Sequence, residues 1–327
     1  MVRIGVLGIA HMHGYSYIRK LKKRNDAEIV GLFDHDASRS TNACEELSIK
    51  PFEDPASLVD ACDGIIVASE NSMHRKYVEL AAVNGKQVLC EKPIATNLED
   101  AQAIVRTCRQ NGVKLQMAFP VRYSASVRKA KKIIDDGLLG KVMCLTCTNH
   151  GKMPGGWFVD PVLGGGGAVM DHTVHVVDVV RWLLNCEFTE VFAVFDTLIH
   201  DIPVEDCGLE MFRLSTGQFM TLDCSWSRPR SHPYWGDVTL RIVGTLGTLF
   251  IDVFNSKIEV YSNQTGTRWE NFGDDLDSLM IEEFLEVTCQ GREPFTSGID
   301  GLKSLTAVLA AYESHRIGGI VTIDPDS

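Results

Sequence analysis

Residues 2–14 read VRIGVLGIAHMHG, which joins a short apolar run, a glycine turn and the start of a stretch with helical spacing. Similar apolar runs follow at 28–34, 64–69, 86–93 and 114–119, and stretches with helical spacing separate them at 37–47, 72–84 and 97–111. Short strands that alternate with helices are typical of a parallel sheet covered on both faces. We therefore predict an α/β domain over residues 1–121.

The pattern changes after residue 121. A helix is predicted at 124–136, a strand at 141–150 and, after a glycine-rich loop, a helix at 168–185. Strand-like runs then dominate, at 188–199, 207–215, 218–227, 237–243, 247–253 and 257–262, before helical regions at 277–290 and 300–316. Strands joined by short turns favour a mostly antiparallel sheet. We predict an α+β domain over 122–327, whose C-terminal helix can return to the first domain.

Composition limits the class of protein. The chain has 327 residues, 45% of them apolar, and a formal net charge of −11; this length suggests roughly two domains. The acidic excess argues against general affinity for nucleic-acid phosphates, which needs clustered cations. No apolar run is long enough for a membrane helix, and the first residues lack a secretory signal. We expect a soluble, cytoplasmic protein with neither a nucleic-acid nor a membrane partner.

The ten cysteines are scattered, apart from Cys144 and Cys147. These two lie in a predicted strand, where positions three apart point to opposite faces and cannot chelate one ion. A structural zinc site usually needs two such pairs, or one pair with spaced histidines. We expect reduced thiols that pack as small apolar residues, and we predict no metal site.

The turn after the first strand is the first chemical signal. Gly8 fits the first glycine of a dinucleotide-binding turn, whereas Ala10 and His13 occupy the second and third positions and Gly14 follows. The free N–H groups at the start of the next helix can still hold a phosphate. A tight turn in a fold that binds no nucleotide is the alternative. We expect the cofactor to contact Gly8, Ile9, Ala10, His11 and Met12.

Asp34 ends the second strand, 26 residues after Gly8. A carboxylate at this place can accept hydrogen bonds from the adenosine ribose hydroxyls and repels a 2′-phosphate. The sequence therefore favours NAD over NADP, although Asp34 could instead cap the next helix.

Residues Glu91, Lys92 and Pro93 follow the fourth strand, at the edge of the sheet where α/β proteins bind ligands. Pro93 restricts the backbone of the residue before it. A lysine held there can donate a hydrogen bond to a substrate oxygen. The alternative is a charge that is simply solvated.

The third signal joins the glycines at 164–167 to a predicted helix. Asp171 and His175 are four residues apart and share a helix face, and Asp178 follows three residues later. A histidine flanked by carboxylates suits a general base for an alcohol proton, and the glycines allow close approach of a ligand. The alternatives are a zinc site of Asp171, His172 and His175 or a structural polar face.

Together these segments resemble the glucose–fructose oxidoreductase/inositol dehydrogenase (Gfo/Idh/MocA) family. The resemblance rests on the glycine turn, Asp34, the Glu91-Lys92-Pro93 tripeptide and the pattern GGGxxxDxxxHxxD that ends at Asp178. The tail from Asp300-Gly301 to Gly318 is similar to the family's C-terminal helix. The resemblance covers essentially the whole chain. It implies a Rossmann-type NAD(P)-binding domain followed by a domain with a large, open-faced sheet.

The resemblance implies an NAD(P)-dependent dehydrogenase of sugars, polyols or cyclitols that forms a homodimer or homotetramer through the open sheet. By family analogy Lys92 polarises the substrate oxygen, His175 is the acid/base, and Asp171 binds a neighbouring hydroxyl. Glu70 stands where a proline is commoner. The family's cofactor contacts correspond to Ser69, Asn71, His74, Glu91 and Lys92.

Further substrate contacts are expected from His172, from Arg122 at the domain crossover and from the aromatic face of Trp157. Arg122 could equally pair with an acidic neighbour, and Trp157 could simply pack in its loop. His11 and His13 depart from the usual glycine-rich turn, and they could face the second domain or solvent.

Two other functions stay open. The first is a glycoside-cleaving enzyme that uses tightly held NAD for transient oxidation and elimination. The second is a non-catalytic cofactor-binding protein, which the altered glycine turn would favour. The complete set of Lys92, Asp171 and His175 argues against the second.

Overall fold

The computed structural model describes residues 1–324, which form two compact units. The first consists of Met1–Pro120, Val162–Gly165 and Leu276–Leu305, and the second of Val121–Pro161, Gly166–Asp275 and the chain from Thr306 on. Residues 276–305 were predicted within the second domain, so the structure differs there from the expected continuous division. Within the described residues, no helix has the length and apolar character needed to cross a membrane.

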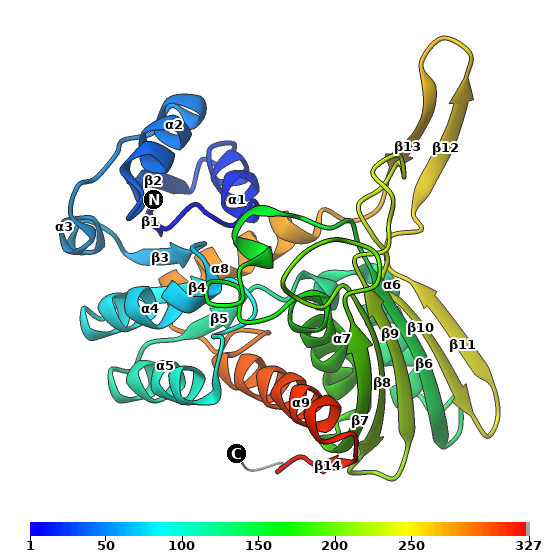
Figure 1. Ribbon diagram of the computed structural model, residues 1–327. Helices are drawn as coiled ribbons and strands as arrows, with labels where there is room; N and C mark the ends of the chain where they lie inside the picture. The colour runs from blue at the N-terminus through cyan, green and yellow to red at the C-terminus, as the bar shows by residue number, and fades with distance from the viewer. Residues whose placement is uncertain (325–327) are drawn as a thin grey trace. The chain divides into compact units, whose positions relative to one another are not determined.

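The first unit contains a five-stranded parallel sheet in the order β2-β1-β3-β4-β5 (Figure 1). Its strands are β1 (Val2–Leu7), β2 (Ala27–Phe33), β3 (Gly64–Val67), β4 (Gln87–Cys90) and β5 (Leu115–Met117). Its helices are α1 (His13–Leu21), α2 (Ala37–Leu47), α3 (Pro55–Asp60), η1 (Asn71–Met73), α4 (His74–Val83), α5 (Leu98–Gln110) and α8 (Leu276–Gln290).

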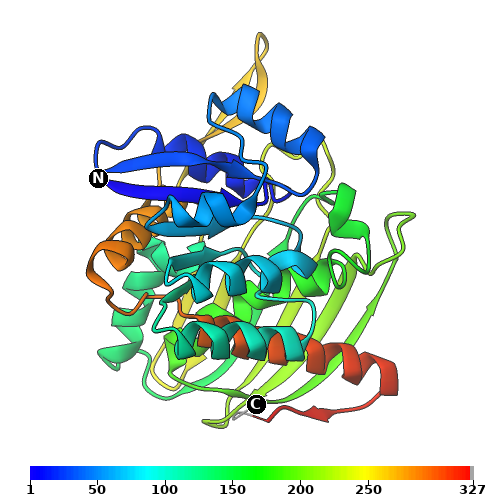
Figure 2. The ribbon, with the colours of Figure 1, turned by 90° about the vertical axis from the view of Figure 1, so that its left-hand side faces the viewer.

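Strand order reverses between β1 and β3, because the chain moves outward to β2 and then returns to the other side of β1. Crossovers in opposite directions place their helices on opposite faces of a sheet. In agreement with this, α1 packs against α2 and α8, whereas α4 packs against α3 and α5; the parallel run of α4 and α5 is visible in Figure 2. Ligands of such sheets bind at the carboxyl ends of the strands beside the reversal.

Helix α8 explains why a distant segment belongs to the first unit. It packs against α1, β1 and β4, and a Cβ added at Gly64 would lie 3.1 Å from the Phe284 ring. Met280, Ile281 and Phe284 of this helix are fully buried. An apolar helix face must be covered by another element, and here the parallel sheet of the first unit covers it.

The second unit contains a seven-stranded sheet in the order β11-β10-β6-β9-β8-β7-β14 (Figure 1). Its strands are β6 (Val142–His150), β7 (Phe188–Asp196), β8 (Cys207–Leu214), β9 (Phe219–Ser225), β10 (Thr239–Gly244), β11 (Thr248–Asp252) and β14 (Val321–Thr322), and a separate hairpin joins β12 (Lys257–Ser262) and β13 (Gly266–Asn271). Only the β6–β9 pair among these is parallel. The sheet is therefore mixed and mostly antiparallel, as predicted.

Helices cover one face of this sheet. Helix α7 (Ala168–Leu184) packs on β6, β8 and β9, and α6 (Ala125–Asp135) packs on α7 and β11; the short helix η3 (Gly156–Val159) follows β6. Burial alternates along β8, where Glu210 and Phe212 are buried and Leu209 and Met211 are exposed. Two helices span the division between units: η2 (Pro120–Tyr123) and α9 (Gly298–Ile317), whose residues from Thr306 on belong to the second unit.

The ten cysteines are free thiols in this fold. Seven of them are buried, as expected of thiols that pack as small apolar residues, whereas Cys144 and Cys207 are partly exposed and Cys289 is exposed. The side chain of Cys147 is buried, whereas that of Cys144 on the same strand is partly exposed. The alternating burial along β6 therefore places these two thiols on opposite faces.

Candidate functional site

The glycine turn lies at the carboxyl end of β1, beside the strand reversal. Gly8 has φ +81°, and a Cβ added to it would lie 2.4 Å from the Cβ of Ser69. Only glycine suits this conformation and this approach. Helix α1 begins five residues later, with Met12 as its N-cap and no side-chain cap hydrogen bond. A helix start without a side-chain cap at this edge is a suitable place for an anionic group.

Asp34 connects this turn to the end of β2. Its carboxylate accepts hydrogen bonds from the backbone N–H of Ile9 at 2.8 Å and from Arg39, whose guanidinium binds both oxygens. The helix-cap alternative for Asp34 is wrong, because Asp36 is the N-cap of α2. The cap carboxylate accepts from the N–H groups of Ser38 and Arg39.

The loop after β3 and the first residue of α4 carry three of the predicted cofactor residues, Ser69, Asn71 and His74, all of them buried. Asn71 donates its side-chain N–H to the Gly164 carbonyl at 2.8 Å, and His74 donates its Nδ1–H to the Pro93 carbonyl at 2.9 Å. Burial lowers the pKa of His74, so its imidazole is neutral.

Three buried polar atoms on this loop have no hydrogen-bond partner in the described chain: Oε2 of Glu70, Oδ1 of Asn71 and Nε2 of His74. Buried acceptors without donors are costly, and a dinucleotide's ribose and carboxamide groups carry such donors. The residues at this edge of the sheet therefore fit a nicotinamide dinucleotide.

Glu91 follows β4 and is fully buried among donors. Its Oε1 accepts the Tyr17 hydroxyl at 2.5 Å and the Nδ1–H of His13 at 3.1 Å, and its Oε2 lies 3.8 Å from Nε2 of His11. Burial alone would raise the pKa of this carboxyl, but the charges of His11, His13 and Lys92 outweigh burial and lower it. Glu91 is therefore an ionised carboxylate that holds the two histidines of the glycine turn.

Within residues 1–324, the group of side chains with metal-ligand spacing is His11, His13 and Glu91, whose ligand atoms lie within 4.8 Å of one another. This group differs from the zinc alternative considered above, which consisted of Asp171, His172 and His175, and no metal was expected at either place. The His13 N–H donates to Nδ1 of His11 at 3.3 Å. This bond places the proton of a neutral His11 on Nε2, the nitrogen that faces Glu91, so the arrangement suits proton sharing better than metal ligation.

Lys92 lies directly after Glu91 and is only 5% exposed. Its backbone N–H donates to Oε2 of Glu91 at 3.1 Å, and its peptide bond to Pro93 is cis. The Pro93 carbonyl in turn is held by His74. The solvated-charge alternative for Lys92 is therefore wrong, because a buried lysine at this edge is enclosed by the fold.

In the second unit, the first turn of α7 brings together Asp171 and His172. The indole N–H of Trp226 donates to Oδ2 of Asp171 at 3.2 Å, and Nε2 of His172 lies 3.3 Å from the same oxygen. His172 donates its Nδ1–H to the Asn149 carbonyl at 2.8 Å. Two buried side chains thus fix the orientation of the Asp171 carboxylate, which is itself partly exposed.

His175 lies one turn further along α7 and is buried. The helix predicted at 168–185 is present, so Asp171 and His175 share a face as expected. Asp178 is fully buried, and both of its oxygens bind the guanidinium of Arg122, at 2.8 and 2.5 Å. The structure thus contains the ion pair that was one of the two alternatives for Arg122.

The glycine run before α7 is close to protein groups. A Cβ at Gly166 would lie 2.0 Å from the Tyr312 hydroxyl oxygen, and one at Gly167 would lie 1.9 Å from the Glu205 carbonyl oxygen. Oε1 of Glu205 accepts hydrogen bonds from the N–H groups of Gly167 and Val169 and from the Tyr312 hydroxyl at 2.6 Å. We predicted that the glycines allow close approach of a ligand. In the structure, the space beside Gly166 and Gly167 is occupied by Tyr312 and Glu205, which hold the start of α7.

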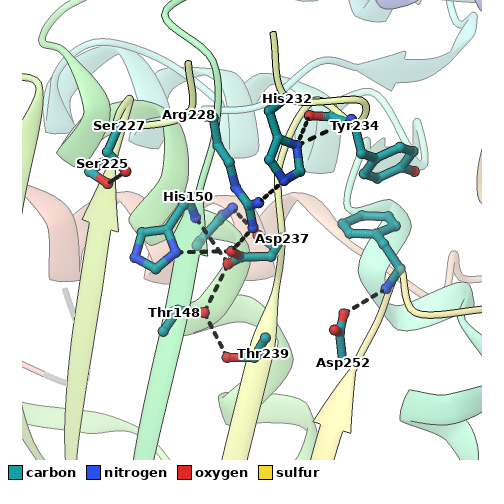
Figure 3. A network of polar contacts seen from close by, with 12 residues as sticks. Thr148, His150, Ser225, Ser227, Arg228, His232, Tyr234, Asp237, Thr239 and Asp252 are labelled. Atoms are coloured by element: carbon teal, nitrogen blue, oxygen red, sulfur yellow. Dashed lines mark hydrogen bonds and ion pairs between the residues drawn. The ribbon is translucent and has the colours of Figure 1, made fainter. Parts of the chain in front are cut away.

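The loops around Asp171 are held by aromatic and polar contacts. The Trp157 ring stacks on Phe158 at 4.0 Å between centroids, and Phe158 packs against the buried cluster that includes Trp226. The loop that follows β9 is tied to β6 by Asp237, which accepts from Nδ1 of His150 at 2.9 Å and from Arg228 (Figure 3). Asp223 and Asp237 raise the pKa of His150 to about 9, so it carries a charge at neutral pH.

Sequence reasoning missed several residues that position the predicted ones. They share one property, which is that each reaches its partner from a distant part of the chain: Asn149, Glu205, Trp226 and Tyr312. No spacing rule applies to such pairs. Only Trp226 carried a signal, as an aromatic residue in the strand-like run at 218–227.

Comparisons with known proteins match both parts of the chain to one family. The family described as "Oxidoreductase family, NAD-binding Rossmann fold" (GFO_IDH_MocA) matches residues 2–119, and the GFO/IDH/MocA C-terminal domain matches residues 127–250. The chain is 26% identical to scyllo-inositol 2-dehydrogenase (NAD(+)) of Bacillus subtilis, over 99% of this chain and 96% of that protein. It is 30% identical to an uncharacterized oxidoreductase of Streptococcus pneumoniae, over 79% and 70% respectively.

Among solved structures, a probable dehydrogenase from Thermotoga maritima superposes with a TM-score of 0.84 at 26% identity, covering 98% of each chain. The two family matches together span the parallel-sheet unit and most of the mixed sheet. The chain therefore belongs to the Gfo/Idh/MocA family of NAD-binding oxidoreductases.

Proposed function

We propose that this oxidoreductase transfers hydride from a secondary alcohol of a sugar, polyol or cyclitol to NAD. The observation that carries the proposal is the buried Lys92, enclosed at the carboxyl end of β4 in an NAD-binding sheet. The substrate class is supported by the similarity to a scyllo-inositol 2-dehydrogenase along nearly the whole chain.

In this proposal bound NAD supplies the hydride acceptor, and the chain supplies the proton chemistry. The Lys92 ammonium donates a hydrogen bond to the alcohol oxygen and stabilises the negative charge that develops there. His175 accepts the hydroxyl proton while hydride leaves the same carbon, so the alcohol loses one hydride and one proton and becomes a carbonyl. Asp171, oriented by Trp226, binds a neighbouring hydroxyl. Trp157 is proposed as a further substrate contact, and His172, predicted as another, is proposed instead as a positioning residue, because its ring nitrogens face Asn149 and Asp171.

The test measures NADH formation at 340 nm with a panel of polyols, cyclitols and aldoses. Lys92→Met and His175→Asn should each lower kcat at least about a hundredfold, as expected for loss of an electrostatic or acid–base group. Lys129→Met and His315→Asn change exposed residues of the same types and should leave turnover unchanged.

Two outcomes contradict the proposal. Unchanged turnover in both site variants would remove Lys92 and His175 from the chemistry. NAD that stays bound to the purified protein, with glycoside cleavage and no NADH accumulation, would favour the oxidation–elimination reaction instead. Mass spectrometry of the purified protein and a chromogenic glycoside assay detect that case.

We also propose that the chain assembles as a homodimer or homotetramer through the sheet face that α7 leaves uncovered. Apolar side chains that are about half exposed or more gather on its strands: Val194, Leu209, Met211, Phe219 and Phe250. Exposed apolar patches of this kind mark interaction surfaces. Leu209→Glu should dissociate the assembly in sedimentation velocity, and a monomeric wild type would contradict the proposal. A cytoplasmic location stays a prediction from composition.

A further inference from the structure

The carboxylate of Asp34 has no acceptor site left for another donor. Its Oδ2 accepts from the Ile9 N–H at 2.8 Å and from Nε of Arg39 at 3.0 Å. Its Oδ1 accepts from the Asp36 N–H at 2.8 Å and from Nη2 of Arg39 at 2.7 Å. A carboxylate offers about four lone-pair sites, so these four bonds occupy them all. Any further recognition at the end of β2 must involve another group.

Glu70 is that group. It lies on the loop after β3, is 3% exposed, and its Oε1 lies 2.8 Å from Nη2 of Arg39. The guanidinium of Arg39 is therefore shared by two buried carboxylates. The second carboxylate oxygen, Oε2 of Glu70, is buried and has no hydrogen-bond partner in the described chain. A buried carboxylate oxygen without a donor is costly, which indicates that a ligand supplies the donor.

The group formed by Asp34, Glu70 and Arg39 has one carboxylate more than it has guanidinium groups. Two carboxylates, Asp34 and Glu70, surround the single guanidinium of Arg39, and the nearby His35 lies 3.7 Å from Asp34 and 3.9 Å from Glu70. An arginine near this position is the usual partner of the 2′-phosphate of NADP. Arg39 cannot serve a phosphate in that way while both carboxylates neutralise it.

We propose that Glu70 is a cofactor-selectivity residue, which rejects the 2′-phosphate of NADP by holding Arg39 and offers Oε2 to a hydroxyl of NAD. Asp34 alone does not account for the selectivity, because its oxygens are already occupied. Removing the charge of Glu70 would leave the side of the Arg39 guanidinium that now faces Glu70 available to bind a phosphate. The inference concerns binding and does not depend on which alcohol is oxidised.

The test compares dissociation constants of NAD and NADP, measured by titration calorimetry at fixed ionic strength. Glu70→Gln should tighten NADP binding by about tenfold, the size expected for one screened charge at contact distance, and should change NAD binding by less than about threefold. Glu70→Ala, a second variant without the amide, should shift the ratio of the NAD and NADP dissociation constants in the same direction. Glu79→Gln, which changes a half-buried partner of Arg75 on α4, should leave the ratio unchanged.

A double variant, Glu70→Gln with Arg39→Leu, should lose the gain in NADP affinity. An unchanged ratio of the two constants in both Glu70 variants, or a gain that persists without Arg39, would overturn the inference and leave the proposed function intact. A wild type that binds neither dinucleotide would overturn both.

Discussion

The indole N–H of Trp226 donates to the carboxylate of Asp171, although 55 residues separate them. Trp226 is fully buried at the start of the loop that follows β9, and Asp171 is in the first turn of α7. The bond fixes a partly exposed carboxylate to a rigid side chain.

Trp226→Phe should therefore lower kcat/KM for the alcohol substrate by roughly tenfold or more, because a hydrogen bond to a charged group contributes about 1.5–3 kcal/mol. Trp182→Phe is the matched control, since Trp182 lies near the far end of α7. Steady-state kinetics and thermal melting separate the loss of orientation from the loss of packing. Equal kinetic losses in both variants would contradict a specific role for Trp226.

Gly167→Ala should destabilise the protein by about 2 kcal/mol, the usual cost of forcing a group into a filled space. The added Cβ would meet the Glu205 carbonyl oxygen at 1.9 Å, and backbone cannot rotate away. Gly247→Ala, whose Cβ would come no closer than 3.5 Å to its nearest neighbour, should be nearly neutral. Urea unfolding measures both changes. If Gly167→Ala leaves the free energy of unfolding unchanged, the backbone of Glu205 does not pack tightly against the start of α7.

Glu210 should make stability depend on pH. Burial raises the pKa of this carboxyl from 4.5 to about 8, and Oε2 accepts the Thr173 hydroxyl at 2.6 Å. The folded protein holds the proton more tightly than the unfolded chain does. The stabilisation is therefore complete below pH 4.5 and is lost as the pH rises through about 8.

In Glu210→Gln the melting temperature should fall less between pH 5 and 9 than in the wild type. Glu190→Gln, at an exposed ion pair with Arg213, should keep the wild-type slope. Parallel slopes in all three proteins would show that Glu210 does not titrate in this range.

His13 should titrate above its ordinary range because of Glu91. Burial lowers the pKa of His13, but the charge and the hydrogen bond of Glu91 outweigh burial and raise it above 6.5. The stabilisation from His13 is present below pH 6.5 and is lost as the pH rises through the raised pKa. The pKa of Glu91 is lowered, so the stabilisation that Glu91 contributes is present above pH 4.5 and is lost as the pH falls through the lowered pKa.

The imidazole proton resonances of His13, followed by NMR between about pH 5 and 9, should therefore shift to a lower midpoint in Glu91→Gln. Glu190→Gln, which changes an exposed carboxylate paired with Arg213, is the control variant and should leave the His13 midpoint unchanged. If the His13 midpoint does not move, Glu91 is not the group that holds its proton.

The local parts of the fold could be predicted from the sequence. Helix α2 has the predicted bounds, and α5 begins after its predicted cap Asn97 and ends before Gly112, with φ +65°. Several short elements were missed, among them α3 and β13. Helix α3 is only six residues long, although Asp54 caps it and Pro55 starts it, and β13 pairs only with β12 in an isolated hairpin. Short elements carry too little periodic pattern to be recognised.

The candidate site could be predicted only in part, for a related reason. Gly8, Asp34 and Lys92 follow strand ends, and strand ends can be located by the pattern of apolar runs. The contacts that hold the site together, such as His74 with Pro93 or Arg39 with Glu70, depend on which loops lie side by side in the folded chain. The pattern of a single sequence does not indicate which loops these are.

Helix α8 has a consequence for the order in which the protein folds. It completes the packing around β1 and β4, yet more than half of the chain separates it from β4 and more than four-fifths from β1. During synthesis the first strands therefore emerge long before the segment that covers them. The cofactor-binding unit cannot reach its final packing until residues near 305 have left the ribosome, and cutting the chain at residue 121 would yield a fragment with a bare apolar surface.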